Sequence, residues 1–568
     1  MSQRRLLLNS SMSSERSLHH HGSNLSHLIH SSSSPVINYR STHTNPSLFE
    51  RCLENPFVNS SLQLEASHSQ KSKNQILLEL IEWNRGEFIS CIKAWVDVIV
   101  KTQIDEPYQA LMESSSKHGG RATALKITAH DLDPYTGISG VLYMLIYLYI
   151  KANSQCTWTS PPPSECSSQG ASVETPTRVE NREECSEISE ANIPSPSPQN
   201  LNVNLFSLQY LKEKIEHCVK IIELVIKGST IQLDNGDISM IGGMMGCFTL
   251  CAVAYDILGD RNNSEMNMAR IEHYISKLCL VNVSNNQSKP ISNEWLFGRI
   301  GYVYGRAFLR AYKAWNENWI AGISSPSHES PFENDSEITQ VVNEILKDGS
   351  SHHKNSYMWE WHDEKYLGSV HGVAGITTIL LDIPKVRKNQ EVYSKILNTI
   401  NSIMSMQYPD GNFPSSLGSK TSRLLQLCHG ATGYVGLLLK LYGLTGDSTY
   451  VDSAKKSCHC LWIYGLLKKG LGLCHGIFGN LFPFLQMYTT LQDEEYLYKA
   501  IRFAQFGCEN QSSLISTPDH PFSLFEGIAG SVIVLDGLLR CMDCYQCGAS
   551  PSPTSIHMPG FDLNLFMN

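Results

Sequence analysis

The chain has 568 residues, of which 42% are hydrophobic and 17% charged, and its formal net charge is −9 at neutral pH. A negative chain lacks the basic face of a nucleic-acid-binding protein, so we exclude nucleic acid as a partner. No run approaches the ~18 apolar residues that span a bilayer, and the apolar stretch after Arg5 is too short for a secretory signal. We therefore expect a cytoplasmic protein; the alternatives are the nucleus and peripheral association with a membrane.

The seventeen cysteines are odd in number and irregularly spaced over a long chain. A disulfide framework is typical of short exported proteins, and no export signal is present. The sequence therefore predicts reduced thiols, a few of which bind metal or react.

Composition divides the chain into folded and unfolded parts. Residues 1–75 are rich in Ser, His and Asn, and residues 153–200 are rich in Ser, Glu and Pro. Such stretches bury too little apolar surface to offset the entropy of ordering, so we expect a disordered arm and a disordered insertion. A smaller loop is expected at 322–336. Residues 76–562 are then one domain, and residues 563–568 are a C-terminal tail.

The remaining sequence predicts helices. Apolar residues recur every three or four positions from Ile76 to Val100, from Leu211 to Ile226 and from Tyr496 to Cys508. Alternation of apolar and polar residues, the signal of a strand, is scarce, so the expected class is all-α.

A Gly-x-x-Gly pattern opens an apolar helix seven times, at a spacing of roughly fifty residues once the low-complexity loops are removed. The pairs are Gly137–Gly140, Gly243–Gly246, Gly298–Gly301, Gly372–Gly375, Gly430–Gly433, Gly476–Gly479 and Gly527–Gly530. Glycine allows a sharp turn into a helix and close approach of two backbones. Seven stacked helical hairpins bury most surface when they close into a ring. We predict an α/α toroid whose inner helices begin at these glycines, with the preceding loops gathered at one mouth.

The residues just before the glycines carry the candidate chemistry. Repeats five and six read Cys428-His429 and Cys474-His475, and repeat four supplies His371. Zinc takes thiolate and imidazole ligands in four-coordinate geometry, and catalytic sites leave one position for water or substrate. Two Cys-His pairs at equivalent positions therefore predict a zinc site. The spacing does not decide whether four side chains or three bind the metal.

Several ordered motifs together resemble the eukaryotic lanthionine synthetase C-like proteins, over about residues 76–150 and 201–562. The motifs are Asn293–Tyr302, Glu360-Trp361, His371–Ile376, Leu427–Gly430, Leu466–Gly476 and Thr517–Gly527.

This resemblance implies one zinc ion per chain, bound by Cys428, Cys474 and His475, with the fourth position open. It also implies glutathione as co-substrate, bound at Lys469 and in the loop Thr517-Pro518-Asp519. The family pattern has an arginine before Thr-Pro-Asp, whereas this chain has Ser516, which removes one expected cationic contact.

A coordinated thiol is deprotonated, so the expected nucleophile is a zinc-bound thiolate. Its addition to dehydroalanine or dehydrobutyrine gives a thioether and leaves an enolate that needs a general acid. His371 is the candidate acid. Arg299 is the candidate for stabilising the enolate, with an ion pair to Glu294 as its alternative role.

Two functions follow from these residues. The favoured one is a zinc-dependent thioether-forming transferase that adds glutathione to dehydroamino acids in proteins or peptides. The alternative is a non-catalytic protein that uses the same zinc and glutathione site for redox sensing or signalling. A glycosidase with this architecture is disfavoured, because it needs two opposed carboxylates and the mouth positions offer only Glu526.

Overall fold

The computed structural model describes residues 48, 50–117, 131–155, 205–229, 233–276, 279, 291–321, 329–350 and 355–566. The chain divides into the units Met1–Thr44 and Asn45–Asn568. The first unit, and most of the insertion expected at 153–200, lie outside the described residues.

The described residues form helices and no strands; three isolated bridges are the only β pairings recorded among them. The helices are α3 (Leu62–Ser69), α4 (Lys73–Val100), η2 (Lys101–Asp105), α5 (Glu106–Lys117), α6 (Ile138–Gln155), α7 (Leu208–Gly228), α8 (Met244–Leu258), α9 (Arg261–Arg270), η4 (Ile271–Ile275), α11 (Arg299–Ala321), α12 (Ser336–Ser350), α13 (Val373–Leu380), α14 (Pro384–Lys388), α15 (Gln390–Met404), α16 (Thr432–Thr445), α17 (Ser448–Tyr464), α18 (Ile477–Leu491), α19 (Glu494–Glu509), α20 (Gln511–Leu514), α21 (Ile528–Gln546), η5 (Pro553–Ser555) and η6 (Asn564–Phe566). None of the described helices is both long enough and apolar enough to cross a membrane.

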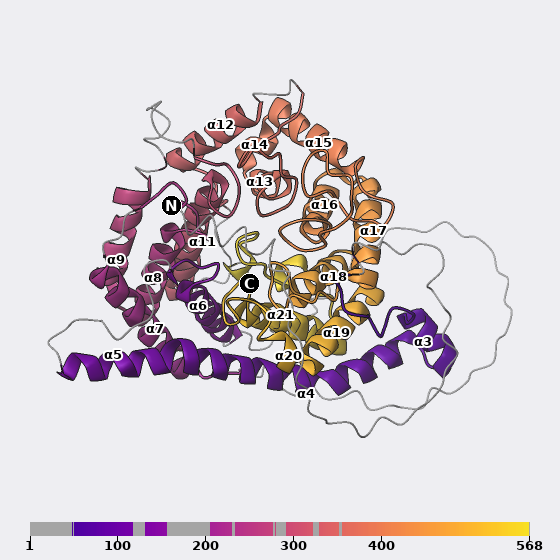
Figure 1. The fold of residues 1–568 in the computed structure, drawn as a ribbon, viewed down its shortest axis with the longest axis horizontal. Helices are drawn as coiled ribbons and strands as arrows, with labels where there is room; N and C mark the ends of the chain where they lie inside the picture. Colours follow the sequence, from indigo (N-terminus) through magenta and orange to yellow (C-terminus); the bar gives the residue numbers. More distant parts are fainter. Residues whose placement is uncertain are drawn as a thin grey trace, which may run out of the picture. The chain divides into compact units, whose positions relative to one another are not determined.

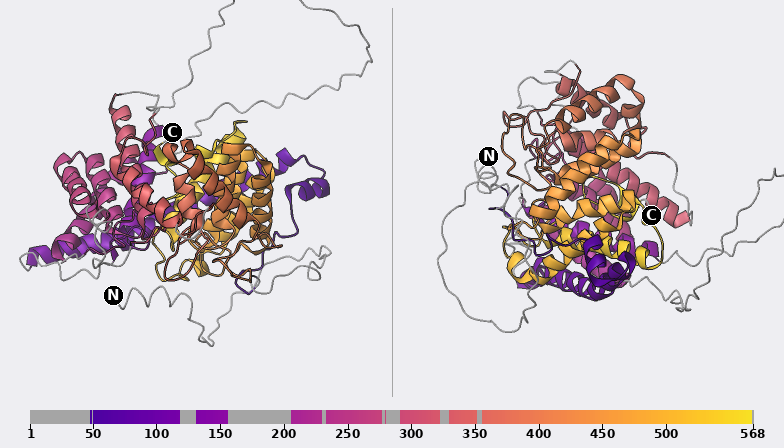
Figure 2. Two further views of the ribbon diagram at one scale, coloured as in Figure 1. Left: turned by 90° about the horizontal axis from the view of Figure 1, so that it is seen from above. Right: turned by 90° about the vertical axis from the view of Figure 1, so that its right-hand side faces the viewer.

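The helices of the second unit form the predicted α/α toroid. Each of α6, α8, α11, α13, α16, α18 and α21 packs against the next, and α21 packs against α6, which closes the ring. Outside them lie α7, α9, α12, α15, α17 and α19 (Figure 1). The N-terminal helix α4 packs against α21. Seen from above, the helices drawn in orange and yellow run side by side (Figure 2, left).

The glycine pairs mark the starts of the inner helices, as predicted. In all seven described pairs the second glycine lies against the carbonyl oxygen of the residue six positions earlier, where a Cβ atom would collide with it. Met240 plays this part for Gly246, and Ser369 for Gly375. The loop before each inner helix therefore folds back onto the first turn of that helix, and only glycine leaves the space.

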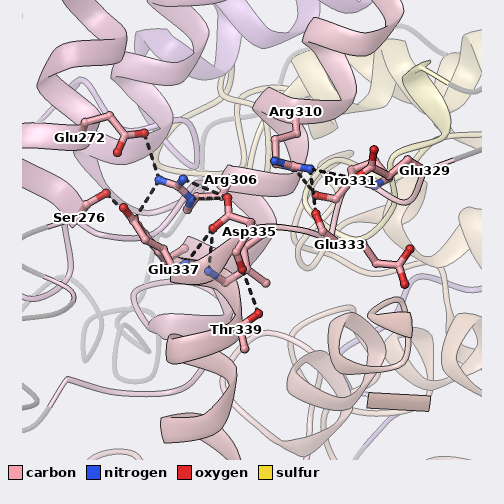
Figure 3. A network of polar contacts seen from close by, with 12 residues as sticks. Glu272, Ser276, Arg306, Arg310, Glu329, Pro331, Glu333, Asp335, Glu337 and Thr339 are labelled. Atoms are coloured by element: carbon pink, nitrogen blue, oxygen red, sulfur yellow. Dashed lines mark hydrogen bonds and ion pairs between the residues drawn. The ribbon is translucent and has the colours of Figure 1, made fainter. Parts of the chain in front are cut away.

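Ion pairs hold the inner helix α11 to its outer neighbours (Figure 3). Arg306 on α11 lies 3.1 Å from Glu272 on η4, 3.0 Å from Asp335 and 2.9 Å from Glu337 at the start of α12. Arg310, one turn further along α11, donates to two backbone carbonyls of the loop before α12. These pairs fix the orientation of α11, whose first turn borders the candidate site.

Residues 50–75 contact the toroid, which corrects the prediction of a disordered arm over residues 1–75. The Asn55 side chain donates to the carbonyl of Trp462 at 2.6 Å, and Cys52 pairs with Leu467 in an isolated bridge. Glu65 on α3 forms an ion pair with Arg502 at 2.9 Å. Composition misses this segment because hydrogen bonds, rather than a periodic apolar face, attach it to the toroid.

The C-terminal segment enters the ring. η5 packs against α18 and α21, and η6 packs against α6 and α11, so the yellow end of the chain lies within the ring in Figure 1. Leu563, Leu565 and Phe566 are buried, so the tail expected from residue 563 is part of the core. Phe561 stacks on Trp295 with centroids 4.5 Å apart, and the Trp295 indole donates to the Gly560 carbonyl at 2.6 Å.

The close approach at the helix starts predicts opposite effects for two glycine substitutions. Gly246→Ala should lower the free energy of unfolding by about 1–3 kcal/mol, because the new methyl group overpacks against the Met240 carbonyl. Gly86→Ala, on the exposed face of α4 where nothing lies within 4 Å, should raise it by about 0.5–1 kcal/mol. Chemical denaturation measures both; equal effects of the two substitutions would contradict the proposed role of the glycine pairs.

Candidate metal and thiol site

The loops that precede the inner helices are hydrogen-bonded to one another around the mouth of the ring. Leu427 N–H donates to Cys474 O at 2.9 Å, and Cys474 N–H donates to Phe525 O at 2.8 Å. Phe525 N–H donates to Tyr135 O at 3.1 Å, and Tyr135 N–H donates to Ile241 O at 2.9 Å. Residues that are far apart in sequence but equivalent in the repeats therefore lie side by side.

The two predicted cysteines form a buried pair. The Cys428 thiol is hydrogen-bonded to the Cys474 thiol and to the imidazole of His475. The bond from Cys474, together with the positive charge available on His429 and His475, holds the pKa of Cys428 well below its usual range. The pKa of Cys474 is raised well above its usual range by its hydrogen bond to Cys428, by burial and by the negative charge on Cys428.

The donor chemistry of this cluster fits zinc, which prefers thiolate sulfur and imidazole nitrogen. Cys428 is within hydrogen-bonding reach of both other predicted ligands. As the side chains stand, however, no group of three or more His, Cys, Asp or Glu among the described residues is arranged to hold a metal ion. Every described cysteine is a free thiol. The zinc site thus remains a prediction.

His371 lies beside this cluster and is firmly oriented. Its Nδ1 is 3.1 Å from the Glu294 carboxylate, and its ring stacks on Trp361 with centroids 4.4 Å apart. The same carboxylate accepts the backbone N–H groups of Leu296 and Phe297 at 2.9 and 2.6 Å. A carboxylate held in this way accepts a hydrogen bond from Nδ1–H, so Nε2 is the nitrogen that can exchange a proton with a substrate.

His429 lies next to both the thiol pair and His371. Its ring centroid is 5.9 Å from that of His371, and it follows Cys428 directly. Burial, and secondarily the positive charges of His371 and Lys469, outweigh the opposing effect of Cys428 and lower the pKa of His429. Its Nδ1 is buried with no hydrogen-bond partner among the described residues. The structure therefore places His475 on the thiols and His429 toward His371.

Arg299 is held elsewhere. It is buried, and its guanidinium donates to Asp348 on α12 at 2.7 Å and to Asn293 at 3.2 Å. Among the described residues, Arg299 forms no hydrogen bond or ion pair with His371 or with either thiol. The alternative of an ion pair with Glu294 is replaced by the pair with Asp348.

A small cationic pocket, with a cavity volume of about 20 Å³, lies next to the thiol pair. Arg51, Arg423 and Lys469 line it together with Gln426. The Gln426 amide donates to the Cys428 sulfur at 3.0 Å, so this residue joins the pocket to the thiols. The remaining lining residues are apolar: Leu48, Leu424, Leu425 and Leu467.

The second predicted glutathione segment borders the Lys469 loop. Gly470 has φ +101°, and a Cβ there would lie 3.0 Å from the Pro518 ring. Thr517 and Asp519 are exposed, and the Thr517 hydroxyl donates to the Ser513 carbonyl at 3.1 Å. The structure thus brings together both segments that the sequence assigned to glutathione.

Sequence reasoning missed Arg51, Arg423, Gln426 and Tyr135. Arg51 falls in the segment that composition marked as disordered. Tyr135 had a usable signal, because it stands two residues before Gly137 just as Cys428 and Cys474 stand two residues before their glycines. Its hydroxyl is hydrogen-bonded to the Cys474 thiol.

Comparison with known proteins agrees with the motifs. A family model described as Lanthionine synthetase C-like protein matches residues 203–543, which is more than half of the chain. The chain therefore belongs to the lanthionine synthetase C-like family.

Two relatives extend this match. The chain is 31% identical over 311 residues to Glutathione S-transferase LANCL1 of Danio rerio, covering 53% of this chain and 71% of that protein. It is 25% identical over 356 residues to LanC-like protein GCL1 of Arabidopsis thaliana, covering 61% of this chain and 75% of that protein. Among solved structures, Nisin cyclase matches with a TM-score of 0.47 and 14% identity, covering 82% of this chain and 98% of that chain.

Metal content will test the predicted ligands. The purified protein should carry about one zinc ion per chain, and Cys428→Ala, Cys474→Ala and His475→Ala should each lose most of it. His429→Ala should keep its zinc, and so should Cys458→Ala, which removes a buried thiol on α17. Zinc retained in both ligand-cysteine variants, or lost in the Cys458 control, would show that the site is elsewhere.

Proposed function

We propose that this protein is a zinc-dependent transferase that adds the thiol of glutathione to dehydroalanine or dehydrobutyrine residues of proteins or peptides. The observation that carries the proposal is the Gln426 contact, because it joins a three-cation pocket to the sulfur of Cys428. Glutathione has two carboxylates and one thiol, which match cations at one end of a site and a thiol-binding metal at the other.

Family membership supports the same conclusion. A relative with 31% identity is named a glutathione S-transferase, and the family name refers to lanthionine, a thioether. The chemistry common to both names is the transfer of a thiol sulfur to carbon.

When bound, zinc supplies the positive charge that keeps a thiol deprotonated at neutral pH. The side chains of the chain do the rest. Lys469, Arg51 and Arg423 bind the carboxylates of glutathione, and this compensates for Ser516 in place of the family arginine. The apolar lining of the pocket limits water, which strengthens these charge contacts.

The addition forms one C–S bond and moves the electron pair of the C=C bond onto the α-carbon and carbonyl of the dehydroamino acid. The glutathione thiol proton passes to Nε2 of His371, and Glu294, which accepts from Nδ1–H, stabilises the resulting positive charge on the ring. Nε2 then delivers that proton to the α-carbon, so the net reaction is addition of S–H across the double bond. Arg299 has no part in this proposal, because Asp348 holds its guanidinium.

Activity on a dehydroalanine peptide will test the proposal. Zinc-loaded protein with glutathione should form the thioether adduct, detected by mass spectrometry, and His371→Phe should reduce the rate by about 10²–10⁴-fold. Chelator-treated protein is the control. If zinc and glutathione bind but no thiol forms an adduct, the redox-sensing alternative is favoured instead.

The pocket predicts a substrate-specific effect at one of two neighbouring lysines. Lys469→Ala should raise the KM for glutathione on the order of tenfold, because a charged hydrogen bond contributes about 1.5–3 kcal/mol. Lys468→Ala is the matched control, since Lys468 is exposed and donates to the Glu50 carbonyl at 3.0 Å. With cysteamine, which has no carboxylate, the two variants should behave alike. A loss that is equal for both thiols would mean that Lys469 acts on the fold rather than on the carboxylates.

A further inference from the structure

The proposed reaction requires that only one of three neighbouring sulfurs attacks the electrophile. The thiolates of Cys428 and Cys474 would lie beside the thiolate of the substrate, and all three would face the same electrophile. Thiolates are the reactive form of sulfur, so the ligand sulfurs must be less nucleophilic than the sulfur of the substrate.

Each ligand sulfur has its own neutral hydrogen-bond donor. For Cys428 the donor is the Gln426 amide, with Nε2 at 3.0 Å from Sγ. Gln426 is 8% exposed, and its backbone N–H donates to the His429 carbonyl at 3.0 Å. The turn that carries Cys428 therefore also fixes the direction of the amide.

For Cys474 the donor is Tyr135, which two backbone hydrogen bonds bring beside it: Cys474 N–H donates to Phe525 O at 2.8 Å, and Phe525 N–H donates to Tyr135 O at 3.1 Å. The Tyr135 hydroxyl is thereby within hydrogen-bonding reach of the Cys474 thiol. The Tyr135 ring stacks on Phe525 with centroids 5.1 Å apart and an interplanar angle of 8°. Its backbone is held on both sides by the hydrogen bonds to Phe525 and Ile241 described above. The hydroxyl is thus placed by the ring of loops itself.

The repeat explains why the two donors differ. Gln426 stands four residues before Gly430, and the equivalent residue four positions before Gly476 is Gly472. A Cβ at Gly472 would collide with the Glu526 carbonyl, so no side chain can reach Cys474 from that position. The donor comes instead from the loop of the first repeat.

We propose that Gln426 and Tyr135 are positioning residues that donate to the ligand thiolates of Cys428 and Cys474, and so direct the reaction to the sulfur of the substrate. A hydrogen bond stabilises the negative charge on the sulfur that accepts it and lowers its nucleophilicity. This inference rests on the proposed zinc site and transferase function, and it adds the origin of selectivity among the three sulfurs.

The test uses the full-length, zinc-loaded protein without glutathione. Gln426→Met keeps the length of the side chain but removes the donor, and Tyr135→Phe removes only the hydroxyl. With iodoacetamide as probe, Gln426→Met should be alkylated about tenfold faster at Cys428, and Tyr135→Phe about tenfold faster at Cys474, as peptide mass spectrometry will show. Tyr143→Phe is the control, because its buried hydroxyl contacts His557 at 2.7 Å.

A second measurement separates hydrogen bonding from a change in access. In cobalt-substituted protein, the thiolate-to-metal charge-transfer band should move to longer wavelength in both variants and not in Tyr143→Phe. A change in access or packing alone would not move this band. Unchanged bands together with unchanged alkylation rates would overturn the inference.

The outcomes for the two proposals are distinct. A wild-type protein that binds zinc and shows these shifts, but adds no glutathione to a dehydroalanine peptide, contradicts only the proposed function. A wild-type protein that adds glutathione, with variants that show no shift, contradicts only the role of Gln426 and Tyr135. A protein that binds no zinc contradicts both.

Discussion

Each inner helix begins where a loop carbonyl lies against the helix backbone, and the rest of the architecture depends on this contact. The second glycine of each pair has no side chain at the point where the carbonyl of the residue six positions earlier makes its approach. Because the approach recurs in all seven repeats, each loop meets the first turn of its helix in the same way. They can then hydrogen-bond to one another from Leu427 through Cys474, Phe525 and Tyr135. A larger residue at one glycine would displace a loop and, with it, one of the chemical groups.

Because the loops share this geometry, residues at equivalent positions of different repeats lie close together. Three of the residues that stand two positions before a first glycine are Cys428, Cys474 and Tyr135, and their side chains interact with one another. The next residue along is His371, His429, His475 or Glu526, according to the repeat. Close packing makes the charges strongly interdependent. The hydrogen bond to Cys428, burial and the negative charge on Cys428 raise the pKa of Cys474. Burial raises the pKa of Tyr135, and the negative charges on Cys474 and Cys428 raise it further. A metal ion that accepts both sulfurs would relieve this repulsion, which is a physical reason to expect zinc here.

The features that could be predicted from the sequence are those that repeat. Seven glycine pairs predict the toroid, and the duplicated Cys-His predicts that two thiols meet. Contacts that occur once could not be predicted in this way. Arg51 reaches the pocket on a segment with no apolar periodicity, and Gln426 faces Cys428 only because of the local turn. Arg299 shows the converse, because its position in a family motif suggested catalysis while the guanidinium pairs with Asp348.

The C-terminal segment adds a structural connection to the site that no motif indicated. It enters the ring and holds Trp295 through the Gly560 carbonyl and the Phe561 ring. Trp295 follows Glu294, whose carboxylate orients His371. The backbone N–H of Trp295 donates to the carbonyl of Val370, the residue before His371. The segment therefore supports the proposed acid from inside the ring, whereas the cationic pocket is lined by Arg51, Arg423 and Lys469. The proposed proton donor and the pocket are thus supported by separate parts of the chain.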